Sequence, residues 1–101
     1  MIDESQRENY RKVAFNLYTL RISKNLSQQA LANRSDVERS KISRIENYSE
    51  DFLFSTILKL APHLDTTTEK ILNLNVEVPD TFEANKEKVN LNSSKKQKDH
   101  L

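Results

Sequence analysis

The sequence predicts a small all-α domain, and two observations carry that prediction. Apolar residues recur at helical spacing from Tyr10 to Leu20, which indicates one long helix near the N-terminus. The stretch 28–47 then reads as two short helices joined by a tight turn, with Ile42 and Ile45 three residues apart on one face of the second. A short helix with a buried apolar seam and an outer face rich in hydrogen-bond donors is typical of a helix-turn-helix.

The composition limits the class of protein. One domain is expected from 101 residues, of which 36% are apolar and 31% charged. A run of about 18 apolar residues, which a membrane span needs, does not occur, and the polar N-terminus does not resemble a secretory signal. Because the chain lacks cysteine, we expect neither a disulfide framework nor a cysteine metal site. A cytoplasmic protein is the expectation.

Catalysis is not expected from this sequence. His63 and His100 are isolated, and no paired-carboxylate or Ser-His-Asp pattern accompanies them. The chain also contains no glycine, which a P-loop or a dinucleotide-binding fingerprint requires. We therefore expect a binding protein with no cofactor and no metal, and not an enzyme.

The net charge of +1 conceals an uneven distribution. Residues 21–48 carry six Lys and Arg against three Asp and Glu, a net charge of +3, whereas residues 49–78 carry two against five, a net charge of −3. Local charge decides phosphate contact, because salt screens charges beyond about 8 Å. The basic stretch favours a nucleic-acid partner, and chance clustering in a small protein is the alternative.

The first helix should run from a capping residue at Ser5, with Glu8 completing a capping box, to about Ser23. Asn25 follows, where a helix end needs a residue that tolerates the left-handed conformation. Ser27 should cap the second helix, from Gln28 to about Asn33.

The third and fourth helices are placed by similar signals. Asp36 should occupy the tight turn, followed by the third helix from Arg39 to about Asn47, and Asn47 could end it in the left-handed conformation. Asp51 is the expected N-cap of the fourth helix, and Pro62 should bend or shorten its last turn. Its buried face should contain Phe54, Ile57, Leu60, Ala61 and Leu64.

After a short fifth helix over Glu69 to Asn73, capped within 66–68, the periodicity changes. Apolar Leu74, Val76 and Val78 alternate with polar residues, which is typical of a short strand. Such a strand could pair with its copy in a second subunit. An extended segment that packs its apolar side on the domain is the other interpretation. Residues 80–101 are polar, with a possible helix from Asp80 or Thr81 to about Val89 and a disordered end from Asn92.

From about Val13 to Leu72 the sequence resembles the Cro/C1-type (Xre-like) helix-turn-helix DNA-binding domains of phage repressors and bacterial regulators. The resemblance implies a compact five-helix, lambda-repressor-like domain whose third helix enters the major groove. Together with the change of periodicity it divides the chain into a helix-turn-helix domain, 5–73, and a C-terminal extension, 74–101, in which 74–78 could be a dimerisation strand and the rest is a polar tail. The residues that carry it are Leu17, Leu20-Arg21, Leu26-Ser27-Gln28, Leu31-Ala32, Val37, Ser40, Ile42 to Glu46, Thr56, Leu58 to Ala61 and Leu64.

The chain departs from the family pattern at four positions. Asn25, Asp36 and Tyr48 stand where the family usually has glycine, and Phe52 stands where it has proline. Either Asn47 takes the left-handed role or the loop after the third helix differs from that of the family, and Phe52 in place of proline could let the fourth helix start earlier.

The resemblance assigns roles on and beside the third helix. Arg39, Ser40 and Arg44 match positions that read base edges, and an arginine can bond guanine O6 and N7 together. Glu38 matches a further groove-edge position, where it could accept from a cytosine amine or simply cap the helix. The candidates for phosphate contact are Gln28, Lys41, Ser43, Asn47 and Arg34.

Arg21 and Glu46 match a pair that forms a largely buried salt bridge in the family. Such a pair would fix the geometry between the first and third helices. We therefore count neither as a DNA contact, although both are charged.

Two functions are compatible with these features. The first is a sequence-specific, homodimeric transcriptional regulator on double-stranded DNA, with dimer contacts through Leu74, Val76 and Val78 or through Phe52 and Leu53. The second is an interaction module, such as an antitoxin or a bridging cofactor, that binds a protein through residues 49–101.

Overall fold

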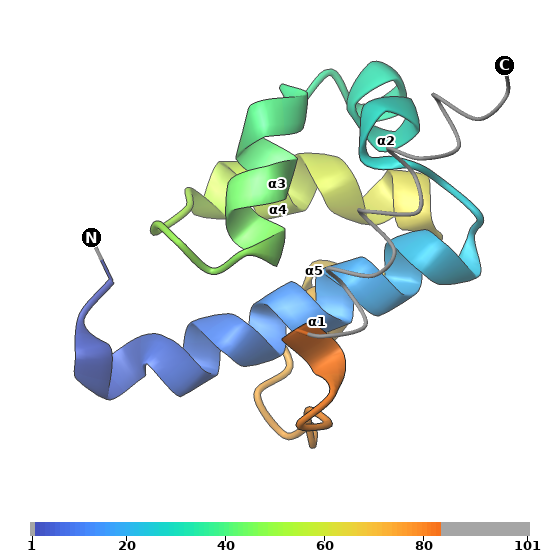
Figure 1. Ribbon diagram of the computed structural model, residues 1–101. Helices are drawn as coiled ribbons and strands as arrows, with labels where there is room; N and C mark the ends of the chain where they lie inside the picture. Colours follow the sequence, from blue (N-terminus) through green and yellow to red (C-terminus); the bar gives the residue numbers. More distant parts are fainter. Residues whose placement is uncertain (1, 84–101) are drawn as a thin grey trace, which may run out of the picture.

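Residues 2–83 are described by the computed structural model, and within them the fold is all-helical with no β-strand (Figure 1). This confirms the predicted five-helix domain. The elements in order are the 3-10 turn η1 (Glu4–Gln6), α1 (Arg7–Ser23), α2 (Gln28–Ser35), α3 (Arg39–Glu46), α4 (Phe54–Leu60), the 3-10 segment η2 (Ala61–Leu64) and α5 (Thr68–Ile71).

The ends of α1 and α2 follow their local sequence signals. Ser27 caps α2, because its hydroxyl accepts from the Ala30 N–H at 3.0 Å. Asn25 (φ 59°) and Asp36 (φ 60°) take the left-handed conformation, as predicted. The chain thus forms these two tight turns with residues whose short polar side chains tolerate positive φ better than most.

Three predicted helix ends are wrong. Ser5 does not cap the first helix but lies within η1, which Asp3 caps by accepting from the Ser5 N–H at 3.1 Å; the N-cap of α1 is Gln6, whose side chain makes no capping hydrogen bond. Asp51 does not cap α4, because this helix begins at Phe54 with Leu53 as its N-cap; the Asp51 carboxylate accepts instead from the Tyr10 hydroxyl at 2.9 Å and from the Phe52 N–H at 2.8 Å. After α3, Asn47 has a φ of −94°, and Tyr48 (φ 38°) takes the left-handed role.

The main core lies between α1 and the other four helices. Pro62 lacks a backbone donor, so α4 ends at Leu60 and the chain continues as the tighter η2. Phe54, expected in the buried face of α4, is 59% exposed, because the helix starts there and presents it to solvent. The buried residues of the main core are Val13, Leu17, Leu26, Leu31, Ala32, Val37, Ile42, Ile45, Ile57, Leu60, Ala61, Leu64 and Ile71.

A second group of buried side chains, the aromatic cluster, contains Ala14, Tyr18, Tyr48 and Phe82. Phe82 is only 3% exposed, although it stands in a polar stretch of the sequence. Its ring contacts those of Phe15 and Tyr18 edge to face, with centroids 5.3 and 5.5 Å apart. The cluster therefore fastens the end of the described chain to α1.

Residues 73–79 have no regular secondary structure, so the expected strand at 74–78 does not form within the described chain. Val78 packs against the aromatic cluster and Val76 is half-buried, while Leu74 is exposed. The interpretation as an extended segment that packs on the domain thus describes Val78 best. The helix expected towards Val89 and the polar end from Asn92 lie outside the described residues.

Candidate nucleic-acid interface

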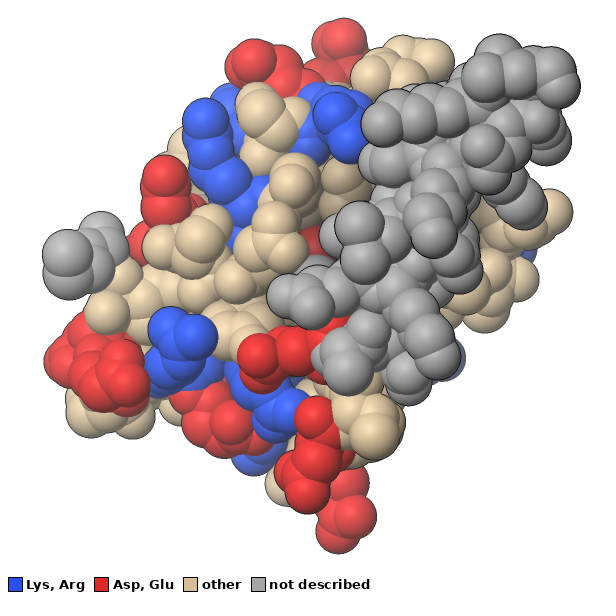
Figure 2. Space-filling model, in the orientation of Figure 1, with Lys and Arg blue, Asp and Glu red and all other residues tan. Residues whose placement is uncertain are grey.

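The helix α3 is divided sharply into a buried and an exposed face. Ile42 and Ile45 are buried in the main core, which leaves the opposite side of this eight-residue helix to solvent. Figure 2 shows Lys and Arg side chains gathered over the part of the surface where α3 lies, whereas basic and acidic side chains alternate over α1. The exposed members of α3 are Arg39, Ser40, Lys41 and Arg44.

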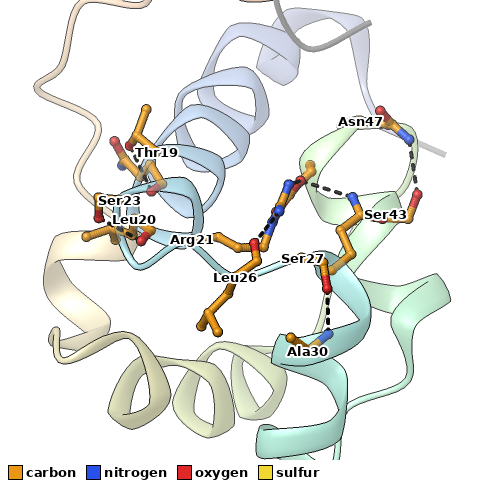
Figure 3. Close-up of polar contacts among 12 residues, drawn as sticks. Thr19, Leu20, Arg21, Ser23, Leu26, Ser27, Ala30, Ser43 and Asn47 are labelled. Carbon is orange, nitrogen blue, oxygen red and sulfur yellow. Dashed lines mark hydrogen bonds and ion pairs between the residues drawn. The ribbon is translucent and has the colours of Figure 1, made fainter. Parts of the chain in front are cut away.

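A buried ion pair holds α3 on α1. Arg21 Nε lies 2.7 Å from Glu46 Oε2, and Arg21 Nη2 lies 2.8 Å from Glu46 Oε1. The third guanidinium nitrogen, Nη1, donates to the Leu26 carbonyl at 2.7 Å. Figure 3 shows Arg21 reaching from α1 towards α3, beside the start of α2. The predicted salt bridge is thus present, and it ties the orientation of α3 to that of α1.

Gln28, at the start of α2, joins this pair. Its Nε2 donates to Glu46 Oε1 at 3.0 Å, and the side chain is half-buried. This contact was not predicted, because sequence reasoning assigned Gln28 to phosphate alone. The amide therefore helps to satisfy the buried carboxylate, and a phosphate contact would have to use its remaining hydrogen.

Arg44 keeps its guanidinium at the surface. Its Nε lies 3.9 Å from Glu50 Oε1, and both side chains are more than half exposed. An exposed ion pair of this length contributes little, typically about 0–1 kcal/mol. The pair with Glu50 can therefore yield to a stronger acceptor such as a phosphate or a guanine.

The remaining predicted contacts lie around the ends of α3 and α2. Glu38 is the N-cap residue of α3, as the capping alternative expects, but its side chain makes no capping hydrogen bond. Asn47 donates through Nδ2 to Ser43 Oγ at 3.3 Å, which joins two of the phosphate candidates. Arg34 is exposed in the last turn of α2.

A hollow lies beside α3, between this helix and the chain that leads to α4. Lys41 and Arg44 line its basic side, whereas Glu50 and Asp51 line the other. Leu53 also lines it and is 67% exposed. The acidic side limits how far the positive potential of α3 extends in this direction.

The loop after α3 is held by contacts that the sequence did not indicate. Besides its hydrogen bond to Asp51, Tyr10 stacks edge to face on Phe52, with ring centroids 5.7 Å apart. The hydrogen bond from Tyr10 to Asp51 spans 41 residues, so no local pattern could have revealed it.

Among the described residues, no helix is both long and apolar enough to cross a membrane. The same part of the chain contains no group of three or more metal-binding side chains.

Two short helices at a tight turn, the second with a basic polar face, define the class of helix-turn-helix DNA-binding domains. The family model described as Helix-turn-helix matches residues 17–71, more than half of the chain, and the chain belongs to this Cro/C1-type family of DNA-binding regulators. The resemblance noted in the sequence is thereby confirmed.

A solved structure supports the fold. The crystal structure of the hypothetical transcription factor NHTF from Neisseria superimposes with a TM-score of 0.60, at 24% sequence identity, over 84% of this chain and 90% of that chain. At this identity the likeness shows the fold alone. No curated protein matches the chain.

Proposed function

We propose that this protein is a sequence-specific transcriptional regulator that inserts α3 into the major groove of double-stranded DNA. The observation that carries the proposal is the exposed face of α3, held in one orientation by the buried Arg21–Glu46 pair. A rigid helix is what base readout needs, because hydrogen bonds to base edges tolerate little displacement. The protein acts by binding and not as an enzyme.

The proposed readers of base edges are Arg39, Ser40 and Arg44, with Glu38 at the edge of the groove. Each arginine can donate two hydrogen bonds to guanine O6 and N7, and Glu38 can accept from a cytosine amine. Backbone contacts would fix the register of α3 without reading sequence. The side chains proposed for phosphate are Gln28, Lys41, Ser43, Asn47 and Arg34.

A homodimer on a two-fold-symmetric operator completes the proposal, because one short helix reads only half a site and half-sites lie about 34 Å apart. The supporting observation is a set of exposed apolar side chains around the start of α4. Leu53, Phe54 and Leu58 are 67%, 59% and 49% exposed, and half-buried Phe52 precedes them. The other proposed dimer surface consists of Leu74, Val76 and Val78 of the proposed C-terminal extension, 74–101.

The same apolar side chains favour a second candidate function, an interaction module that binds a protein through residues 49–101, as an antitoxin or a bridging cofactor would. Leu53, Phe54 and Leu58 would then meet a different protein, and α3 would matter less.

Selection of bound duplexes from a random pool, at physiological salt, tests the proposal. We expect an enriched two-fold-symmetric sequence. The double variant Arg39→Ala/Arg44→Ala should lose the enrichment, whereas the matched control Lys59→Ala/Lys70→Ala, which removes two positive charges from α4 and α5, should keep it. Weak salt-sensitive binding without enrichment would contradict sequence-specific readout and favour the second function.

A further inference from the structure

Tyr48, which lies two residues after the last residue of α3, adopts an unusual backbone conformation. Its φ of 38° lies in the left-handed region, which disfavours a residue with a Cβ and a bulky ring. Its N–H donates to the Ile45 carbonyl at 3.0 Å, and the next N–H, that of Ser49, donates to the Arg44 carbonyl at 3.3 Å. Because these two bonds close the end of α3, whatever holds Tyr48 also holds the end of the helix.

The side chain of Tyr48 has partners on three sides. The ring is buried in the aromatic cluster, and the Arg7 guanidinium carbon lies 4.9 Å from its centroid. Phe82 belongs to the same cluster, so the ring meets the segment that contains Glu83. Burial and a side-chain hydrogen bond with Glu83 raise the pKa of Tyr48, and the same bond lowers the pKa of Glu83. These contacts compensate for the backbone conformation.

Glu83 belongs to a segment that we name the C-terminal clasp, residues 78–83. Figure 1 shows this segment alongside α1. Arg11 donates through Nη2 to the Pro79 carbonyl at 3.0 Å, and its Nε lies 3.4 Å from Glu83 Oε1. Phe82 anchors the clasp in the aromatic cluster. The clasp is therefore fixed to α1 and reaches the end of α3 from there.

A second route links the clasp to α3. The ring of Tyr18 contacts Phe82 on one side, and on the other the Arg21 guanidinium carbon lies 5.4 Å from its centroid. Arg21 in turn holds Glu46 in the last turn of α3. Both routes end in the C-terminal half of the helix that carries Arg44.

We propose that the C-terminal clasp is a positioning element for DNA recognition: by holding Tyr48, it fixes the end of α3 in the orientation that base readout requires. The inference rests on the proposed DNA-binding function. Glu83 acts through Tyr48, Phe82 acts through Tyr48 and through Tyr18, and neither touches DNA. Displacement of the clasp would therefore weaken contacts to bases more than contacts to phosphates, because long basic side chains adjust to a small shift of the helix and bidentate base contacts do not.

The proposal can be tested with a substitution for which electrostatics alone predicts the opposite change in DNA affinity. Removing a negative charge from a DNA-binding protein by itself raises its affinity for DNA. The variant Glu83→Ala should instead lower the affinity for the duplex selected by the wild-type protein by about tenfold or more, the size expected for one lost hydrogen bond to a charged group. Affinity for a scrambled duplex should change less. The control Asp80→Ala removes the same charge from the same segment, and it should leave the affinity equal or slightly higher.

A double-mutant cycle separates positioning from general destabilisation. Tyr48→Phe keeps the ring and removes the hydroxyl, so it should cost about as much affinity as Glu83→Ala, and the double variant should cost no more than either alone. Circular dichroism at the assay temperature checks that each variant is folded. Independent, additive losses, or an affinity for Glu83→Ala that rises as for Asp80→Ala, would overturn the proposal.

Amide hydrogen exchange in the free protein tests the clasp without DNA. Glu83→Ala should speed exchange at Tyr48 and Ser49, whose N–H groups close α3, and leave exchange at Leu31 in α2 unchanged. If the wild-type protein selects no duplex, the proposed function fails. The exchange measurement still tests whether the clasp holds the end of α3. Unchanged exchange at Tyr48 and Ser49 would overturn it.

Discussion

The guanidinium of Arg21 meets both carboxylate oxygens of Glu46, at 2.7 and 2.8 Å, with 5% and 0% of the two side chains exposed. Leu26 and Gln28 satisfy further polar atoms of the pair. Removing both charges from water costs much of what their attraction returns, so such a pair contributes more to geometry than to net stability. Because the pair joins α1 to the last turn of α3, it explains how α1 fixes the orientation of α3.

Loss of one partner should be costly. Glu46→Leu leaves the Arg21 charge buried without its carboxylate, and we expect the free energy of unfolding to fall by about 3–5 kcal/mol. Urea unfolding followed by circular dichroism measures this. The double variant Arg21→Met/Glu46→Leu removes both charges and should recover most of the loss. If the double variant is no more stable than Glu46→Leu alone, the ion pair contributes net stability to the fold in addition to fixing the orientation of α3.

Asp36 offers a test of backbone conformation. Its φ is 60° and its side chain is exposed, so a substitution there alters little packing. Asp36→Gly should raise the free energy of unfolding by about 0.5–1 kcal/mol, and Asp36→Val should lower it by about 1–2 kcal/mol, because a branched Cβ disfavours this region. Thermal unfolding compares the two. A more stable Asp36→Val would contradict the assignment.

Helix starts that depend on residues close by in the sequence could be predicted. The first residues of α2 and α3, Gln28 and Arg39, were predicted correctly, because a capping Ser27 and the Asp36 turn lie beside them. The end of α2 was missed by two residues, since the Ser35 hydroxyl donates to the Leu31 carbonyl at 2.7 Å and is buried in the extra turn. The predicted ion pair of Arg21 and Glu46 also proved correct.

Contacts between distant residues could not be predicted. Phe82 has polar neighbours in sequence, and its burial depends on the outer face of α1, more than 60 residues earlier. Tyr48 took the left-handed conformation in place of Asn47 because its ring has partners on α1 and in the clasp. At the candidate interface, the exposed face of α3 was predicted, whereas the bond from Gln28 to Glu46 was not. The division of that face into base and phosphate contacts stays a prediction.

Lys24 and Asp65 join the loop before α2 to the turn before α5, and their contact should be visible in pH titration. The hydrogen bond and charge of Lys24 hold the pKa of Asp65 below its ordinary value of 3.8. A carboxyl group whose pKa is lower in the folded than in the unfolded protein stabilises the fold at pH values above its pKa in the unfolded protein. This contribution is lost as the pH falls through its pKa in the folded protein. Lys24→Ala should therefore return the pKa of Asp65 towards 3.8, measured from its carboxyl carbon by NMR. The control Lys59→Ala should leave it lowered.

Charged substitutions can distinguish the two proposed dimer surfaces. Phe54 and Leu58 lie four residues apart on α4 and are both exposed, so Phe54→Glu/Leu58→Glu should leave the fold intact. If α4 forms the dimer surface, light scattering at tens of micromolar should change from dimer to monomer. Leu74→Glu/Val76→Glu tests the extended segment in the same way. A wild-type protein that is monomeric at this concentration would contradict a stable dimer.

Arg39 and Lys41 are both exposed on α3, but we assign them different roles. Arg39→Ala should cost about 1–3 kcal/mol of binding free energy on the selected site and relax the preference at one base position, because a bidentate contact to guanine is lost. Lys41→Ala should weaken binding to specific and scrambled duplexes alike and reduce the salt dependence by about one counterion, because it loses a phosphate contact. Titrations of both variants at several salt concentrations separate these outcomes. Equal effects of the two substitutions on specificity would mean that Lys41 reads bases as well, and that the basic face of α3 sits deeper in the groove than proposed.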